Sequence, residues 1–166
     1  FMIEQCARGY NKLFLNFNGT AGLWRKEAIY DGGNWQDDTL TEDMDLSYRC
    51  QLAGWTASYF PDVVVPAELP ESYTAFKSQQ FRWAKGSVQT ALKIMPRVIR
   101  SDASLFAKVQ AFLHMTHYCI HPLMALMALL ALPVLLFTDI SLSTWQFMPF
   151  ALAILIAMTG PSALYC

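Results

Sequence analysis

Three side chains near the middle of the chain have the types and spacing to bind a sugar that carries a diphosphate. Gln79, Arg82 and Trp83 stand at positions i, i+3 and i+4, so on a helix they share one face. The planar fork of Arg82 could bind phosphate oxygens, while the Trp83 ring could lie under the apolar face of a sugar. The Gln79 amide could reach a sugar hydroxyl. The alternative is a helix at the membrane–water interface, where basic and aromatic residues are common.

Five carboxylates lie within nine positions upstream of this face. Three interpretations are open: a calcium loop, acidic residues that complement a helix dipole, or a catalytic base at a helix start. The spacing lacks the alternating oxygen ligands and central glycine of an EF-hand, which speaks against calcium. The five residues are Asp37, Asp38, Glu42, Asp43 and Asp45.

Thr41 is expected to cap a helix that carries these carboxylates in its first turn and ends near Gly54. A carboxylate held there could take the proton from an acceptor hydroxyl as the hydroxyl attacks an anomeric carbon. Asp43 and Asp45 also spell D-x-D, a pattern linked to nucleotide-bound metal. Inside a helix these two side chains point about 200° apart, so we do not expect them to chelate one ion together.

The charge is segregated along the chain. All 12 Lys and Arg residues lie at or before Lys108, and the only carboxylate in residues 109–166 is Asp139. The runs 118–137 and 147–166 are apolar and about 20 residues long, which is enough to span a hydrocarbon core of roughly 30 Å. They predict two membrane helices, the second one truncated. The alternative is a pair of buried helices in a large soluble protein.

The positive-inside rule places the residues before the first run in the cytosol and the short linker 138–146 on the far side. We therefore expect a multi-pass protein of the plasma or inner membrane that contacts membrane lipids. The formal net charge of −1 gives no basic excess for a nucleic-acid partner. Because the chain begins without Met and stops inside an apolar run, we expect a piece of a longer protein.

The coarse pattern predicts an α/β fold. We expect a helix that ends near residue 10, a short helix or turn over 21–29, and longer helices over 72–95 and 105–116, with Pro96 interrupting the first of these two. Apolar and β-branched runs predict strands over 13–17, 56–60 and 63–65. The histidines His114, His117 and His121 would share one helical face, as a metal site or, as we prefer, facing the catalytic domain or the lipid headgroups.

Taken together, five stretches resemble the processive, membrane-embedded family-two glycosyltransferases, among them the cellulose synthases and the plant mannan and glucan synthases. The resemblance covers roughly residues 1–137, in the family's order and spacing. Thr-Glu-Asp alone is a weak signal, but combined with a downstream Q-x-x-R-W and apolar runs it is specific. The stretches are FNGTAGLWR at 17–25, GGNW at 32–35, TEDMDL at 41–46, GW at 54–55 and QQFRW at 79–83.

The resemblance implies an inverting transfer of a hexose from a nucleotide-diphosphate sugar to a growing β-linked polysaccharide. Asp43 matches the family's catalytic base, and its neighbours Thr41 and Glu42 match residues that shape the acceptor pocket. Arg82 matches the residue near the diphosphate. Trp83 matches the residue at the acceptor-binding site, and Gln79 lines the same cavity.

Asn18, Gly19 and Thr20 fall where cellulose synthases carry a Cys-Gly-Ser turn that touches the acceptor end. The Asn-Gly-Thr form is closer to the mannan-type branch, which speaks against cellulose as the product. The family uses a divalent cation, Mg or Mn, and its ligands would lie upstream of this chain. The chain alone is therefore expected to be inactive.

The resemblance implies three regions. Residues 1–71 would be the C-terminal part of a GT-A (Rossmann-like) domain, residues 72–108 amphipathic interfacial helices, and residues 109–166 membrane helices. Two other functions remain open: a glycosyltransferase with a lipid acceptor, such as a ceramide-type lipid, and a non-enzymatic fragment of a membrane transporter or receptor. The number of membrane helices in the complete protein would separate the first of these from a polysaccharide synthase.

Overall fold

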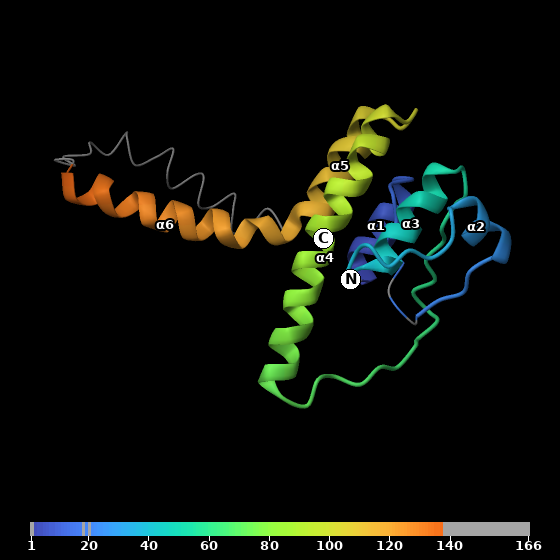
Figure 1. Ribbon diagram of the computed structural model, residues 1–166, viewed down its shortest axis with the longest axis horizontal. Coiled ribbons are helices and arrows are strands. Elements are labelled where there is room, and N and C mark those ends of the chain that lie inside the picture. Colours follow the sequence, from blue (N-terminus) through green and yellow to red (C-terminus); the bar gives the residue numbers. More distant parts are fainter. Residues whose placement is uncertain (1, 18, 20, 138–166) are drawn as a thin grey trace. The chain divides into compact units, whose positions relative to one another are not determined.

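The computed structural model describes residues 2–17, 19 and 21–137, and it divides the chain after Cys119. The described part of the first unit, Phe1–Cys119, is built from helices, of which α3 (Glu42–Leu52) and α5 (Leu105–Thr116) pack against the long helix α4 (Tyr73–Arg100) (Figure 1). The described part of the second unit holds α6 (Ile120–Phe137). The elements of the first unit are α1 (Met2–Tyr10), α2 (Lys26–Asp31), α3 (Glu42–Leu52), α4 (Tyr73–Arg100), α5 (Leu105–Thr116) and the 3₁₀ helix η1 (His117–Cys119).

No strand is present in the described residues, so the predicted strands over 13–17, 56–60 and 63–65 are wrong. The α/β class is thus not seen in this part of the chain, which is helical. A strand needs another backbone to satisfy its N–H and C=O groups. After the second predicted strand the chain instead turns at Pro61, where the Val63 N–H donates to the Phe60 carbonyl at 3.3 Å.

The extended segment 13–17 finds its hydrogen-bond partners on the side chains of α3 instead of on a strand. The Leu15 N–H donates to Oε1 of Gln51 at 2.8 Å, and the Leu15 carbonyl accepts from the Gln51 amide and the Ser47 hydroxyl, each at 2.7 Å. The Phe17 N–H donates to the same Ser47 hydroxyl at 3.2 Å. A run with the apolar pattern of a strand is thus held as a single segment against a helix.

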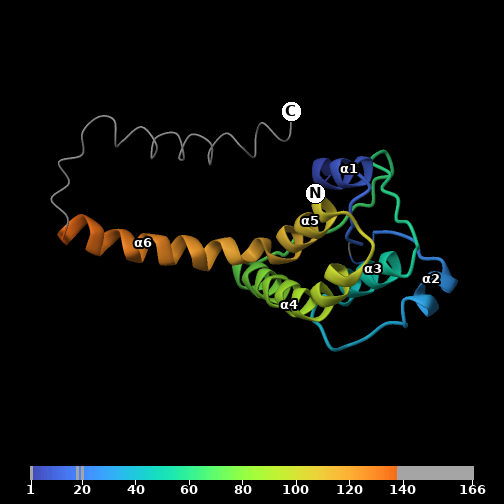
Figure 2. The same ribbon diagram turned by 90° about the horizontal axis from the view of Figure 1, so that it is seen from above.

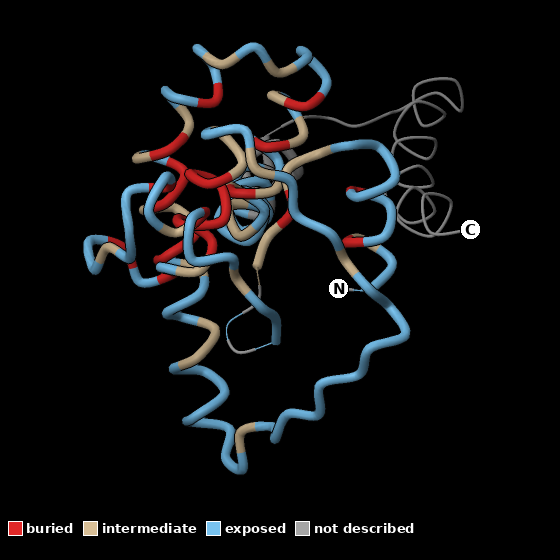
Figure 3. Tube along the Cα trace, turned by 90° about the vertical axis from the view of Figure 1, so that its right-hand side faces the viewer, coloured by how far each residue is buried: buried red, intermediate tan, exposed pale blue. Residues whose placement is uncertain are grey.

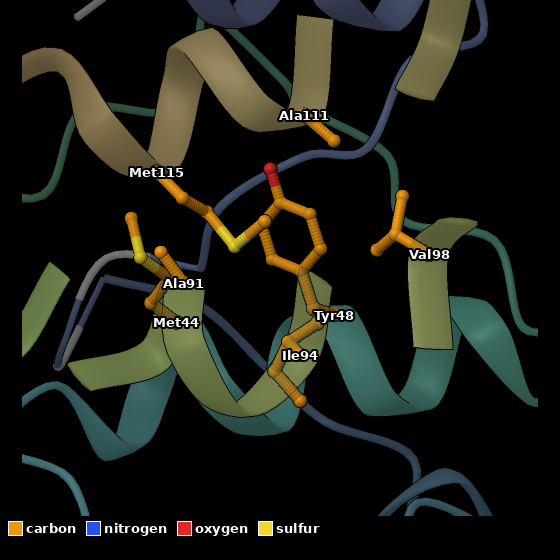
Figure 4. Close-up of a cluster of buried hydrophobic side chains, with 7 residues drawn as sticks. All are labelled: Met44, Tyr48, Ala91, Ile94, Val98, Ala111 and Met115. Carbon is orange, nitrogen blue, oxygen red and sulfur yellow. The ribbon is translucent and has the colours of Figure 1, made fainter. Parts of the chain in front are cut away.

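The main core lies where α3, α4 and α5 meet. Figure 4 shows the Tyr48 ring of α3 surrounded by side chains of all three helices, with its hydroxyl directed towards α5. Figure 3 shows that the buried segments gather in this region, while the first turns of α4 and the connection before them are exposed. The buried members of the cluster are Met44, Tyr48, Ala91, Ile94, Val98, Ala111 and Met115. Figure 2 shows α4 and α5 side by side from a second direction.

The helix predicted after Thr41 is confirmed as α3, and Gly54 follows its end with a φ of 96°, a value that favours glycine. Its Leu46 and Cys50 side chains are buried against Ala28 of α2. Ala53 lies just beyond the last helical residue and is exposed.

We predicted that Pro96 would interrupt helix α4, but the helix runs on to Arg100. Proline removes one backbone donor from a helix and usually bends or ends it. Ile94 and Val98, on either side of Pro96 along the helix, are both fully buried in the core. This packing on both sides of the proline keeps the last turn in place. The predicted helix over 105–116 is confirmed as α5.

The three histidines do not share one continuous helical face, because η1 separates α5 from α6. The same 3₁₀ turn delays the start of α6 to Ile120, which leaves an 18-residue helix about 27 Å long at about 1.5 Å per residue. In the described part of the chain, no helix has both the length and the apolar character needed to cross a membrane. The membrane helix predicted over 118–137 is therefore not found, and the one over 147–166 lies outside the described residues.

Candidate functional site

Asp43, the predicted base, lies in the first turn of α3 with its side chain half-buried. Its Oδ2 accepts the backbone N–H of Gly19 at 2.8 Å, and its Oδ1 accepts the N–H of Met44 at 2.7 Å. A carboxylate can accept about four hydrogen bonds, so both oxygens keep free capacity. Gly19, 24 positions upstream, has a φ of 54°, which suits a turn residue. The predicted base and the predicted acceptor turn thus meet through a direct hydrogen bond.

The residues next to Asp43 have different surroundings. Thr41 precedes α3, but its side chain makes no capping bond; its hydroxyl instead lies 3.0 Å from the hydroxyl of Thr90 on α4. Glu42 is exposed to solvent at the helix start. Asn18 and Thr20 lie outside the described residues, so their predicted role at the acceptor stays a prediction.

Asp45, two positions after the predicted base, is fully buried in an ion-pair network. Its Oδ2 lies 2.7 Å from Arg49 and 3.0 Å from Nζ of Lys93 on α4. Lys93 also donates to Asp38 at 2.7 Å, and this hydrogen bond holds the pKa of the Asp38 carboxyl below its usual value, although desolvation opposes it. Asp38 and Asp45 therefore have a structural explanation, whereas Asp43 faces the Gly19 turn.

Gln79 and Trp83 line one open groove of about 510 Å³ at the start of α4. The rings of Tyr73 and Phe76 contribute to the same wall, together with the second amide, Gln80. Trp83 keeps 42 % of its surface exposed, so its ring is available for contact with a ligand. Aromatic rings beside amides suit a sugar, whose ring faces are apolar and whose edges carry hydroxyls.

Arg82, the predicted diphosphate ligand, is exposed on α4 and is not among the residues that line this groove. Of the three residues predicted to share one face, the structure therefore brings together Gln79 and Trp83. A second groove of about 440 Å³ lies near the other end of α4, and its walls include Arg49, Arg97 and Arg100. None of the predicted site residues that the structure describes lines that second groove.

The groove helix and the segment that leads into Asp43 are joined directly. A Cβ atom at Gly86 would lie 2.6 Å from Cγ2 of Thr41 and 2.9 Å from its backbone nitrogen, so only glycine permits this approach. Beside it, the amide oxygen of Gln89 accepts the Leu40 N–H at 3.1 Å, and Thr90 makes the hydroxyl contact with Thr41. Sequence reasoning missed these residues of α4. A usable signal was present, because Gly86 and Thr90 continue the helical face of Trp83 at spacings of three and four.

The expected divalent cation finds no site among the residues that the structure describes. Within the described ranges, no group of three or more His, Cys, Asp or Glu side chains could hold a metal ion. Asp43 and Asp45 point to different partners, as their helical spacing predicted. These two carboxylates are therefore not assigned as ligands of one cation.

A buried polar pair lies behind the site, where α3 packs on α5. The Tyr48 hydroxyl is 2.7 Å from Nδ1 of His114. Burial lowers the pKa of His114 to about 3, with help from the charges of Arg8 and His117, so the ring is neutral and its Nδ1 accepts a hydrogen bond from the Tyr48 hydroxyl. Burial also raises the pKa of Tyr48, which keeps this donor protonated. We conclude that His114 is part of the packing, which does not fit a metal ligand.

Comparison with known proteins supports the resemblance seen in the motifs. Residues 6–160 match the family described as glycosyl transferase family group 2. The chain is 37 % identical over 165 residues to glucomannan 4-beta-mannosyltransferase 7 of Arabidopsis thaliana, which covers 95 % of this chain and 30 % of that protein. It is 46 % identical over 109 residues to probable glucomannan 4-beta-mannosyltransferase 7 of Oryza sativa subsp. japonica, covering 65 % of this chain and 19 % of that protein.

The chain therefore spans less than a third of the length of these relatives. No solved structure matches it. The family match extends over the predicted base, the acceptor turn and the groove helix, all within residues 6–160. The chain belongs to glycosyl transferase family group 2.

Proposed function

We propose that this chain forms the base-bearing and acceptor-binding part of a longer inverting glycosyltransferase that extends a β-linked polysaccharide. The placement of Asp43 carries the proposal. Its carboxylate is half-buried, fixed by the Gly19 N–H, and carried on a helix that is joined to the groove helix through Thr41 and Gly86. A base held in this way is oriented before the acceptor arrives, which lowers the entropic cost of reaction.

In the proposed reaction an acceptor hydroxyl oxygen attacks the anomeric carbon of the donor sugar. The bond from that carbon to the diphosphate oxygen breaks, the nucleoside diphosphate leaves, and the hydroxyl proton passes to Asp43. Attack from the face opposite the leaving group inverts the anomeric carbon. Trp83 and Gln79 would hold the acceptor sugar in the groove, and Thr41, Glu42, Asn18 and Thr20 are proposed to shape the acceptor end.

Arg82 is proposed to contact the diphosphate. Its exposed guanidinium is free to meet an anion that arrives from outside the groove, and its permanent charge would stabilise the leaving group. A divalent cation, where the family uses one, would neutralise the same diphosphate when bound. Its ligands would come from the GT-A domain upstream, of which residues 1–71 are proposed to be the C-terminal part.

The names of the relatives suggest the donor and the product. Both specify 4-beta-mannosyl transfer in glucomannan, so we propose a nucleotide-diphosphate mannose as the donor and a 4-β-linked mannan or glucomannan as the product. These names do not favour a lipid acceptor, a transporter or a receptor. The cytosolic position of this part of the chain, predicted from its positive charges, is part of the same proposal.

The test supplies the full-length protein with a panel of labelled nucleotide-diphosphate sugars and analyses the polymeric product. We expect β-linked mannosyl transfer by the wild type and a loss of about 10²-fold or more in Asp43→Asn, since a general base contributes that much. Asp37→Asn is the matched control, because Asp37 is an exposed carboxylate just before the helix. Retained transfer in Asp43→Asn would overturn the assignment of the base, and a glycolipid product would overturn the proposed acceptor.

A further inference from the structure

Helix α4 does more than carry the groove, because its next turns are fastened to the segment that ends in Asp43. This junction is made by four residues that follow Trp83 along α4 and are called here the α4 clamp: Gly86, Gln89, Thr90 and Lys93. They stand three, six, seven and ten positions after Trp83, so the clamp begins one helical turn beyond the groove.

Each clamp residue holds a different part of the segment before or inside α3. Gly86 lets the backbone of Leu40 and Thr41 approach so closely that an added Cβ would lie 2.9 Å from the Thr41 nitrogen and 3.0 Å from the Leu40 carbonyl carbon. Gln89 accepts the Leu40 N–H. Moving these backbone atoms would move the start of α3, where Asp43 lies two residues further on.

The other two clamp residues, Thr90 and Lys93, fix the rotation of α3 relative to α4. The hydroxyls of Thr41 and Thr90 are both buried and lie 3.0 Å apart, so each satisfies the other. Lys93 binds Asp45 on α3 at 3.0 Å and Gln36 in the preceding loop at 2.6 Å. Two side chains from α4 thus hold α3 on both sides of Asp43.

We infer that the α4 clamp is a positioning device that sets the distance and angle between the acceptor groove and the base, and so controls the rate of transfer. The inference rests on the proposed function, since it concerns the same reaction. Its physical basis is geometric. A misplacement of about 1 Å between a bound acceptor and a catalytic group can cost about 10²-fold in rate, even when both remain bound and folded.

A change in the α4 clamp should affect catalysis without affecting donor binding to the same extent. The clamp residues contact Thr41 and its neighbours and are not among the residues that line the groove, so a clamp variant should leave the donor KM within about twofold while kcat falls about tenfold or more. Transfer to the sugar acceptor should fall more than transfer to water, because water needs no alignment with the groove. A purely structural role would lower both rates together.

The deciding experiment compares Thr90→Val and Thr90→Ser in the full-length protein, with steady-state kinetics and the ratio of sugar transfer to donor hydrolysis as readouts. Valine keeps the shape and removes the hydroxyl, so kcat and the ratio should fall about tenfold; serine keeps the hydroxyl and should restore both. Ile94→Val, a buried change on the same helix outside the clamp, controls for lost stability and should keep the wild-type kcat.

Gly86→Ala is the second variant, with Gly9→Ala as its matched control because a Cβ there meets no atom within 4 Å. We expect transfer to be lost at Gly86 and kept at Gly9. Should Gly86→Ala not fold, the Thr90 pair decides alone. The inference is overturned when the wild type transfers sugar, Asp43→Asn does not, and Thr90→Val keeps the wild-type kcat and ratio. A wild type without transfer would instead overturn the proposed function.

Discussion

The two halves of helix α4 belong to one continuous helix but have opposite surroundings. In the C-terminal half, Thr90, Ile94 and Val98 are fully buried, and the last two lie in the core shared with α3 and α5. In the N-terminal half, Trp83 on the same helical face is 42 % exposed and lines an open groove. Figure 3 shows this change along a single helix. The C-terminal half is held in place by packing in the core, and the N-terminal half extends from it and exposes its side chains.

The difference explains how an exposed binding surface can be precise. Side chains on a helix that is anchored in a core hold their position better than side chains on a loop. The anchor here is the packed half of α4, and the ring of Trp83 lies one turn beyond Gly86. We therefore expect changes in the packed half to act on stability or alignment, and changes in the open half to act on the ligand.

The largest expected effect comes from truncating one residue in each half. Ile94→Ala removes a fully buried side chain and should lower the free energy of unfolding by about 2–5 kcal/mol. Trp83→Ala should change it by about 1 kcal/mol or less, yet reduce kcat/KM for transfer about tenfold or more. Chemical denaturation and transfer assays on the same full-length preparations measure both. Equal losses of stability in the two variants would contradict the comparison.

The second prediction concerns pH and belongs to the packed region alone. The folded pKa of His114 is about 3 and the unfolded value about 6.5, so the unfolded chain takes up the proton first as the pH falls. The contribution of the buried, neutral His114 to the free energy of unfolding is complete above about pH 6.5 and is lost as the pH falls towards about 3. Arg8 and His117 disfavour the charged ring, while Glu4, 3.6 Å from Nε2, opposes them.

We expect the His114 contribution to fall by about 2 kcal/mol between about pH 8 and about pH 5. Denaturation curves of the wild type and His114→Phe at the two pH values isolate it, because the wild type should lose more stability on acidification than the variant. Tyr48→Phe keeps the imidazole buried and should keep the wild-type pH dependence. The same dependence in His114→Phe as in the wild type would show that another group is responsible.

The sequence predicted the helices of this chain better than its extended segments. The acidic first turn and the glycine after its end predict α3, and apolar spacing predicts α5; all of these are local signals. The segment 13–17 has the local pattern of a strand, but the partners that decide its structure are Ser47 and Gln51 on α3, over 30 positions away. The predicted interruption at Pro96 was wrong for the same reason, because packing against distant residues keeps α4 intact.

The candidate site was predictable in its residue types and only partly in its arrangement. The motifs identified Asp43, Gln79 and Trp83, and the structure adds that Gly19 fixes the first while the other two share a groove. The network around Asp45 could not be read from the sequence, because an acidic residue in a first turn has the same pattern whether it binds Lys93 or water. The helical spacing of Gly86 and Thr90 was visible in the sequence, but their contacts could not be read from it, because the partner segment lies more than 40 positions upstream.

The smallest expected effect is on two helix caps that make the same hydrogen bond. Ser72 caps α4 and Ser104 caps α5; each hydroxyl oxygen accepts a backbone N–H three residues on, at 3.2 Å in both cases. Replacing such a cap by alanine usually costs about 1 kcal/mol. The cap of α5 leads directly into the core at Ala107 and Ala111, whereas the cap of α4 begins the open half.

If the halves of α4 differ as proposed, equal caps should have unequal consequences. Ser104→Ala should lower the global free energy of unfolding by about 1 kcal/mol, because fraying there exposes core residues. Ser72→Ala should leave the global value within about 0.5 kcal/mol and increase hydrogen exchange only in the first turn, at Ala75 and Phe76, with Ile94 unaffected. Since Phe76 lines the groove, this fraying should also weaken acceptor binding. A global loss in Ser72→Ala equal to that in Ser104→Ala would mean that the open half of α4 belongs to the folding unit as fully as the packed half.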